Sequence, residues 1–255
     1  MTGLPHADSA GRPWSGRSFE ANAWAADDGS APPAYLEALA ALQSGQAGPA
    51  AVVDALRPAR LLVPLVADLA EVGEADGRTH DKRAELALPT VAGPDGRAVL
   101  PAFTSADALA RWRPGARPIP APARQVALGA AGDGVELVVL DPGSPTQFGL
   151  RRSAVEALAR DLPWSPPWED AAVIAALRTV AEQEPAVGFA RVGADDPLCQ
   201  LDGAAEVRVV LGLVERLDRD ELTGLIARLQ RAWADEPAVA RVVDSIGVRV
   251  EAATC

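Results

Sequence analysis

The sequence predicts an α+β (α/β) protein made of two small mixed-sheet domains with flanking helices, preceded by a poorly ordered N-terminal arm. Helical segments, whose apolar residues recur three and four positions apart, alternate with short apolar segments typical of strands. The 255 residues exceed the size of one average domain, and a segment rich in Pro and Trp at 163–168 interrupts the pattern. We therefore expect an arm over 1–31, a first domain over 32–162 and a smaller second domain over 163–255.

The arm lacks apolar periodicity and is rich in Gly, Ser, Ala and Asp, which indicates poor order. It nevertheless carries Trp14, Phe19 and Trp24 at five-residue spacing. Large aromatic side chains suit docking on an apolar surface, so these three residues are candidates for partner docking. The alternatives are a frayed tail and an arm that docks on its own domain.

The first domain is expected to mix helices and strands around one sheet. Tyr35, Leu39 and Leu42 share one helix face by their spacing, and Gly93-Pro94-Asp95-Gly96 suits the reverse turn of a hairpin. A proline-spaced stretch at 118–122 is expected to lead into a helix. The expected elements are helices ending near 43 and over 49–57, strands over 60–67, 84–91 and 97–103, helices over 105–112 and 122–131, strands over 135–140 and around 148–150, and a helix over 151–160.

The second domain shows the same alternation. A helix opens at Glu169-Asp170, strands follow at 186–192 and 206–213, and a last strand is expected near 246–251. Asp218 and Glu221 have the spacing of a capping box, which predicts the start of a long amphipathic helix. Residues 163–255 hold 9 basic and 16 acidic side chains, so their net charge is -7.

Composition limits the partners of this protein. The whole chain carries a net charge of -11, whereas binding to a phosphate backbone needs clustered cations. No apolar run approaches the roughly 20 residues of a membrane helix, and the first residues contain no apolar core of a secretory signal. The two cysteines, Cys199 and Cys255, make no disulfide framework, and Cys199 is expected to be a small core or loop residue. We expect a cytoplasmic protein with no nucleic-acid or membrane partner.

Motifs that carry chemistry are missing from the sequence. The one lysine, Lys82, is not in a phosphate-binding loop, and the glycine-rich stretch at 129–134 has the wrong spacing for a dinucleotide site. The two histidines, His6 and His80, have no zinc-ligand spacing. The acidic pair Asp195-Asp196 and the acids at 218–221 are interpreted as turn and helix-cap residues. We expect no catalytic residue, no metal and no cofactor.

One polar constellation keeps functional interest. Asp81, Lys82 and Glu85 directly precede the predicted hairpin, and Asp141 and Gly143 belong to a turn after a predicted strand. If the two strands are neighbours, these residues form a small binding patch, since polar loops on a rigid sheet often carry binding residues. The alternative is a solvated junction between loop and strand.

The sequence resembles the SseB family, which is named for enhanced serine sensitivity. The resemblance rests on RLLVPLV at 60–66, DKRAELA at 81–87, GPDGR at 93–97, LPAFTS at 100–105, ARW at 110–112 and LVVLDPG at 137–143. The lead-in at 26–31 looks like that of actinobacterial members. The resemblance is specific over 30–160 and implies an SseB-type N-terminal domain. It is weaker over 163–255, which looks like the smaller C-terminal domain of many members. The family name refers to a phenotype and implies no reaction.

These observations together predict a non-enzymatic binding or regulatory module. Its partner would be a protein or a small metabolite, with a link to serine or amino-acid metabolism implied by the resemblance. Two alternatives stay open at this point. One is an enzyme that uses the Asp81, Lys82, Glu85 and Asp141 region, and the other is an assembly partner that docks through the aromatic arm. Homodimerisation through the acidic second domain is also open.

Overall fold

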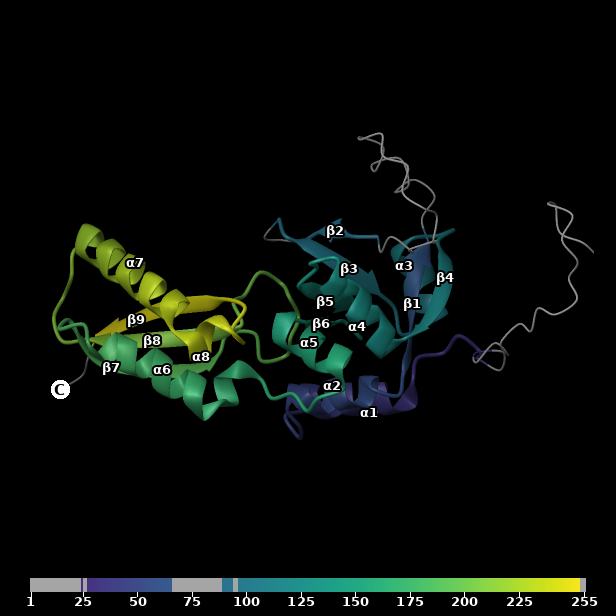
Figure 1. The fold of residues 1–255 in the computed structure, drawn as a ribbon, viewed down its shortest axis with the longest axis horizontal. Coiled ribbons are helices and arrows are strands. Elements are labelled where there is room, and N and C mark those ends of the chain that lie inside the picture. Colours follow the sequence, from purple (N-terminus) through teal and green to yellow (C-terminus); the bar gives the residue numbers. More distant parts are fainter. Residues whose placement is uncertain (1–23, 25–26, 66–88, 94–95, 253–255) are drawn as a thin grey trace, which may run out of the picture.

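The fold is α+β, as the sequence predicts: helices flank three small sheets (Figure 1). The computed structural model describes residue 24 and residues 27–65, 89–93 and 96–252. Within this part, an N-terminal unit (residues 33–160) and a C-terminal unit (residues 167–252) lie side by side along the long axis of the molecule. The described residues include no helix long and apolar enough to cross a membrane.

The N-terminal unit is built around a four-stranded mixed sheet with the strand order β2-β3-β5-β6. Strands β3 and β5 are parallel, and the two outer pairs are antiparallel. The predicted hairpin is confirmed where it is described, because Val91 pairs with Val99 across the turn. The elements are α1 (Pro33–Gln43), α2 (Pro49–Leu56), β1 (Arg60–Leu65), β2 (Val91–Ala92), β3 (Ala98–Ala102), α3 (Ala106–Trp112), β4 (Arg117–Pro122), α4 (Ala123–Gly132), β5 (Leu137–Leu140), β6 (Phe148–Leu150) and α5 (Arg152–Arg160).

Strand β4 differs from the prediction, which treated the proline-spaced stretch only as a lead-in to a helix. It pairs antiparallel with β1, and Pro120 lies opposite Leu62. Leu62 donates its backbone N–H to Phe103 and accepts the N–H of Phe103 in return, so its backbone groups point away from β4. The pairing of β4 with β1 therefore needs no backbone N–H from Pro120, and prolines at alternate positions fit this edge strand.

The two faces of the four-stranded sheet have different surroundings. Leu100, Val138 and Leu140 point toward the helices and belong to the largest hydrophobic core. Their neighbours Val99 and Val139 point to the other face, because successive side chains of a strand alternate, and form a small cluster there against which Leu201 of the C-terminal unit packs. This second face carries the site described below.

The C-terminal unit is a three-stranded mixed sheet with the order β7-β8-β9 and helices packed on it. Trp233 is fully buried and donates its indole N–H to the carbonyl of Leu177 at 3.1 Å. The capping box is confirmed: Asp218 accepts from the N–H of Glu221, and Glu221 accepts from the N–H of Asp218. The elements are η2 (Pro167–Glu169), α6 (Ala171–Glu182), β7 (Val187–Ala194), β8 (Val207–Leu213), α7 (Arg219–Asp235), α8 (Pro237–Ala240) and β9 (Ile246–Ala252).

The end of the predicted arm packs against the N-terminal unit, which corrects the expectation of poor order for residues 27–31. The carboxylate of Asp27 accepts two hydrogen bonds from the guanidinium of Arg60, which is only 5% exposed. These bonds lower the pKa of Asp27 to about 2. A buried cation needs such a partner, and the arm supplies it. Trp24 is half-buried, whereas Trp14 and Phe19 lie outside the described residues.

The segment between the units contacts both of them. Trp168 packs against the hydrophobic cores of the N-terminal and the C-terminal unit, and Trp164 packs against the first. Trp164 also donates its indole N–H to the hydroxyl of Ser153 at 3.1 Å. The predicted domain boundary between residues 162 and 163 stays a prediction.

Candidate functional site

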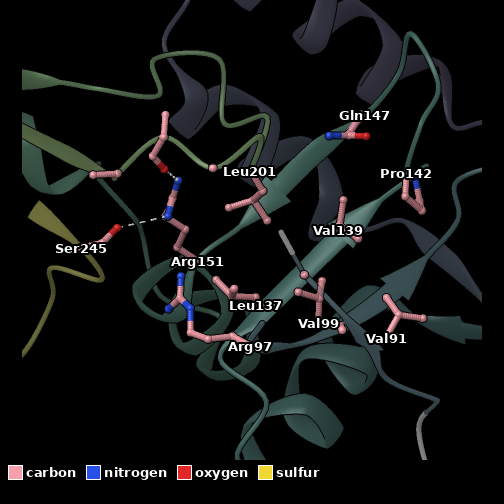
Figure 2. Close-up of a pocket in the computed structure, with 15 residues that line it drawn as sticks. Val91, Arg97, Val99, Leu137, Val139, Pro142, Gln147, Arg151, Leu201 and Ser245 are labelled. Carbon is pink, nitrogen blue, oxygen red and sulfur yellow. Dashed lines mark hydrogen bonds between the residues drawn. The ribbon is translucent and has the colours of Figure 1, made fainter. Parts of the chain in front are cut away.

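A cavity of about 410 Å³ lies between the second face of the four-stranded sheet and the loop that joins β7 to β8 (Figure 2). The N-terminal unit supplies one wall, and the C-terminal unit supplies the other. Its lining residues are mostly aliphatic or small, with few polar side chains at the margins. They are Val91, Ala92, Gly93, Arg97, Val99, Leu137, Val139, Pro142, Gln147, Arg151, Leu201, Gly203, Ala204, Ala205 and Ser245.

The apolar wall results from the alternation of the strands. Val99 on β3 and Val139 on β5 point into the cavity from neighbouring parallel strands (Figure 2). Leu201 faces them from the β7–β8 loop and packs against the same small cluster. A ligand that enters this space would therefore contact aliphatic side chains on two sides.

Gly149 allows the two units to approach closely at this place. A Cβ atom at Gly149 would lie 2.2 Å from Cγ of Leu201 and 3.1 Å from the carbonyl oxygen of Cys199. The backbone N–H of Gly149 donates to that same carbonyl at 2.6 Å. A glycine inside a strand often marks such a close approach of another backbone, and here it brings the β7–β8 loop against β6.

A buried arginine ties the two units together beside the cavity. The guanidinium of Arg151, only 6% exposed, donates to Oδ2 of Asp244 at 2.9 Å and to Oδ2 of Asp196 at 3.1 Å. It also donates to the carbonyl of Ala204 at 2.9 Å. Both carboxylates belong to the C-terminal unit and are almost fully buried. Because the cation and its partners lie on different units, this cluster holds the units in one relative position.

The same cluster leaves little net charge at the cavity. Arg97 binds Asp244 through two hydrogen bonds of 2.7 and 3.1 Å, and its own side chain is 37% exposed. Burial alone would raise the pKa of Asp244, but the hydrogen bonds from Arg97 and Arg151 offset it, so this pKa lies below its ordinary value. The two guanidiniums are thus matched by the carboxylates of Asp196 and Asp244. An anion would find no uncompensated positive charge in this cluster.

Glu206 is the most perturbed acid next to this cluster. Its side chain is 1% exposed, and burial raises its pKa to about 7. The hydrogen bond from the backbone N–H of Asp244, 2.6 Å long, and the positive charge of Arg151 act in the opposite direction without cancelling the effect of burial. The carboxyl of Glu206 is therefore close to half protonated near neutral pH.

The structure describes two of the five predicted binding residues. Asp141 is 1% exposed and accepts hydrogen bonds from the N–H of Thr104 at 2.7 Å, the hydroxyl of Thr104 at 2.5 Å and the hydroxyl of Thr146 at 2.8 Å. Gly143 adopts a positive φ of 74° in the turn and donates its N–H to Gln147. Both residues hold the loop in shape, and their role in binding stays a prediction.

The other three predicted binding residues, Asp81, Lys82 and Glu85, lie outside the described residues. The predicted loop still borders the cavity, through Pro142 and Gln147.

Sequence reasoning missed the contribution of the C-terminal unit to this site. Arg151 is one of many arginines in the chain and has no motif around it. Asp196 was expected to serve a turn, and it does so by accepting the N–H groups of Gln200 and Leu201. Its second role, as a partner of Arg151, depends on how the units dock.

The thiol near the site is protonated, and the described residues offer no cluster of metal ligands. Cys199 is buried as expected, and burial raises the pKa of its thiol, so the thiol stays protonated. Within the part of the chain that the structure describes, no group of three or more His, Cys, Asp or Glu residues could hold a metal ion.

These features define a two-unit α+β protein with a ligand-sized, mainly apolar cavity between its units. Residues 35–157, from α1 into α5, match the family model of the SseB protein N-terminal domain. This part of the chain is therefore an SseB-type N-terminal domain, as the sequence segments predicted. No curated protein and no solved structure matches the chain. An SseB-type C-terminal domain over 163–255 and the actinobacterial type stay predictions.

Proposed function

We propose that this SseB-like protein is a non-enzymatic cytoplasmic binding module, and that it holds a small molecule with an apolar body in the cavity between its units. The observation that carries the proposal is the cavity of about 410 Å³ with aliphatic walls. Small-molecule sites have volumes of roughly 300–1,000 Å³, are mainly apolar and often lie at domain interfaces. The cavity meets all three conditions.

The hydrogen bonds around the cavity favour an apolar ligand. Gln147 accepts from Gly143 and donates to the carbonyl of Gln200, so both ends of its amide are engaged. The hydroxyl of Ser245 accepts from the N–H of Glu206 and donates to Asp244. A polar ligand would lose its hydration and gain few partners, which is costly. The polar end of the ligand would lie at the cavity margin beside the partly exposed Arg97, where it stays hydrated.

These properties refine the expected link to amino-acid metabolism. Free serine is polar throughout and would gain little from Val99, Val139 and Leu201. An amino acid with a branched aliphatic or aromatic side chain would bury that side chain at roughly 25 cal/mol per Å² of apolar surface. We therefore propose amino acids of this kind, or metabolites of similar shape, as the ligand class.

The hydrogen bonds of the carboxylates near the cavity support a binding role over a catalytic one. Asp141 accepts three hydrogen bonds, and Asp196 and Asp244 are both bound to Arg151. A general base must be free to reach a substrate proton, and these carboxylates point to partners inside the protein.

Calorimetric titration with leucine, phenylalanine, valine and serine tests the proposal. We expect the apolar amino acids to bind and serine to give no signal. Val139→Phe would fill the cavity and weaken binding at least tenfold. Val214→Phe is the matched control, because Val214 is 59% exposed and does not line the cavity. Binding that is equal in both variants, or a panel without any binding, would contradict the proposal.

A thermal-shift measurement gives an independent readout of the same binding. A ligand at about 100 times its Kd stabilises the folded state by roughly 2.7 kcal/mol. The stabilisation should follow the order of side-chain hydrophobicity in the panel and should disappear in Val139→Phe.

A further inference from the structure

Strand β9 is the outer strand of the C-terminal sheet and leaves one side open. The sheet order β7-β8-β9 places it at an end (Figure 1), and among the described residues only β8 pairs with it. Its last residues are exposed: the side chains of Arg249 and Glu251 are 67% and 51% exposed, and Val250 is 38% exposed. The open side of such a strand presents unpaired N–H and C=O groups, which can pair with another strand.

The sequence of β9 is complementary to itself. In an antiparallel pair centred on Val250, Arg249 of one copy lies opposite Glu251 of the other, and Glu251 of the first lies opposite Arg249 of the second. Val250 then faces its own copy at the two-fold axis, and Val248 faces Ala252. Opposite charges directly across two strands stabilise the pairing, whereas like charges destabilise it. A two-fold arrangement of this kind is the usual symmetry of a homodimer.

We propose that β9 pairs antiparallel with β9 of a second copy of this chain, which joins the two three-stranded sheets into one continuous sheet. The charge complementarity of the strand with itself identifies the partner. Residues 163–255 carry a net charge of -7, so the net charges of two copies of this part of the chain repel each other. At β9 the charges of Arg249 and Glu251 balance, which makes the strand suitable for the contact.

Both charged side chains are available for such a contact. Arg249 is 67% exposed and forms a long ion pair with Asp195, with 3.6 Å between Nη2 and Oδ1, which is beyond hydrogen-bond distance. Glu251 contacts Arg191 at 2.5 Å on the exposed face of the sheet, where surface ion pairs are worth little. The pairing buries one strand edge only, so we expect a weak dimer whose population depends on concentration.

Sedimentation velocity of the full chain over a wide concentration range tests the pairing. We expect the mass to rise toward a dimer, and we expect R249E or E251R alone to weaken it about tenfold or more, because each variant places like charges opposite each other twice. An equimolar mixture of R249E and E251R, as well as the double variant R249E/E251R, should dimerise again, because opposite charges face each other once more. R228E on α7 is the matched control, because it breaks a surface ion pair with Glu184 away from β9, and it should leave the dimer intact.

A third variant keeps the test decisive if a charge reversal disturbs folding. V250K places two ammonium groups at the two-fold axis and should give a monomer, with its circular dichroism spectrum unchanged. A wild-type chain that stays monomeric at every concentration overturns the proposal. A dimer that persists in R249E, E251R and V250K overturns it too, because the contact would then lie elsewhere. The amino-acid titrations above do not depend on this result, so the two proposals fail separately.

Discussion

Replacing Glu206 by Gln should change how the stability of this protein depends on pH. Burial raises the pKa of Glu206 to about 7 from an ordinary value of 4.5, so the folded state binds the proton more tightly than the unfolded state. Below pH 4.5 the group is protonated in both states and costs nothing by ionisation. As the pH rises from 4.5 to 7, only the folded state keeps the proton, and the free energy of unfolding falls.

The size of this effect follows from the pKa difference. A pKa difference of one between the folded and the unfolded state corresponds to about 1.36 kcal/mol. The free energy of unfolding lost above pH 7 through Glu206 is therefore about 3 kcal/mol. The amide of Gln can still accept the N–H of Asp244 but cannot ionise. Glu206→Gln should therefore exceed the wild-type stability by roughly 1 kcal/mol or less near pH 5 and by about 3 kcal/mol at pH 8.5. Asp244 does not mask the effect, because its pKa is lowered and it titrates in more acidic solution.

Urea denaturation at several pH values between 5 and 8.5, followed by circular dichroism, measures this difference. Glu182→Gln is the matched control, since Glu182 is 41% exposed and forms a surface pair with Arg178. The control should follow the wild type across the range, as expected for an exposed pair. A Glu206→Gln curve that runs parallel to the wild-type curve from pH 5 to 8.5 would refute the reasoning.

Three further substitutions test the packing around the site and one helix start. Arg151→Met leaves the buried carboxylate of Asp196 without the cation that it binds, while Asp244 keeps Arg97, and should lower the free energy of unfolding by about 3–5 kcal/mol in urea denaturation; a loss below 1 kcal/mol would show that the cluster does not hold the units. Gly149→Ala pushes its methyl group against Leu201 and should cost about 1–3 kcal/mol while it weakens ligand binding in calorimetry. Asp218→Ala removes the capping box and should cost about 0.5–2 kcal/mol without any effect on ligand affinity, and an unchanged thermal midpoint would argue against the cap.

Local patterns allowed much of the fold to be predicted from the sequence. Asp218 and Glu221 marked the start of α7, because a capping box depends only on residues three positions apart. The turn at Gly93–Gly96 marked the antiparallel pair of β2 and β3 for the same reason. Strand β4 was not predicted, because proline lacks the N–H that a strand interior needs and the partner strand is not known from the sequence. Leu62, which lies opposite Pro120, exchanges its backbone hydrogen bonds with Phe103, so the pairing of β1 with β4 needs no N–H from Pro120.

The candidate site could not be predicted in the same way. Arg151 and Asp244 are 93 positions apart, and their contact exists because two units dock with β6 against the β7–β8 loop. Nothing in the residues around either side chain encodes that docking. The predicted loop after β5 does border the cavity, yet its most polar residue, Asp141, is buried in hydrogen bonds with Thr104 and Thr146. A charged loop residue can bind a ligand only if its charge is not already bound within the protein, and the sequence does not show which partners it has.

A crystal structure of the chain grown with the tightest-binding amino acid of the panel tests the proposed function most directly. We expect density for the apolar side chain of the ligand between Val139 and Leu201, with its polar end toward Arg97. Density for the ligand on another surface, with the space between Val139 and Leu201 filled only by water, would contradict the proposal that this cavity is the binding site.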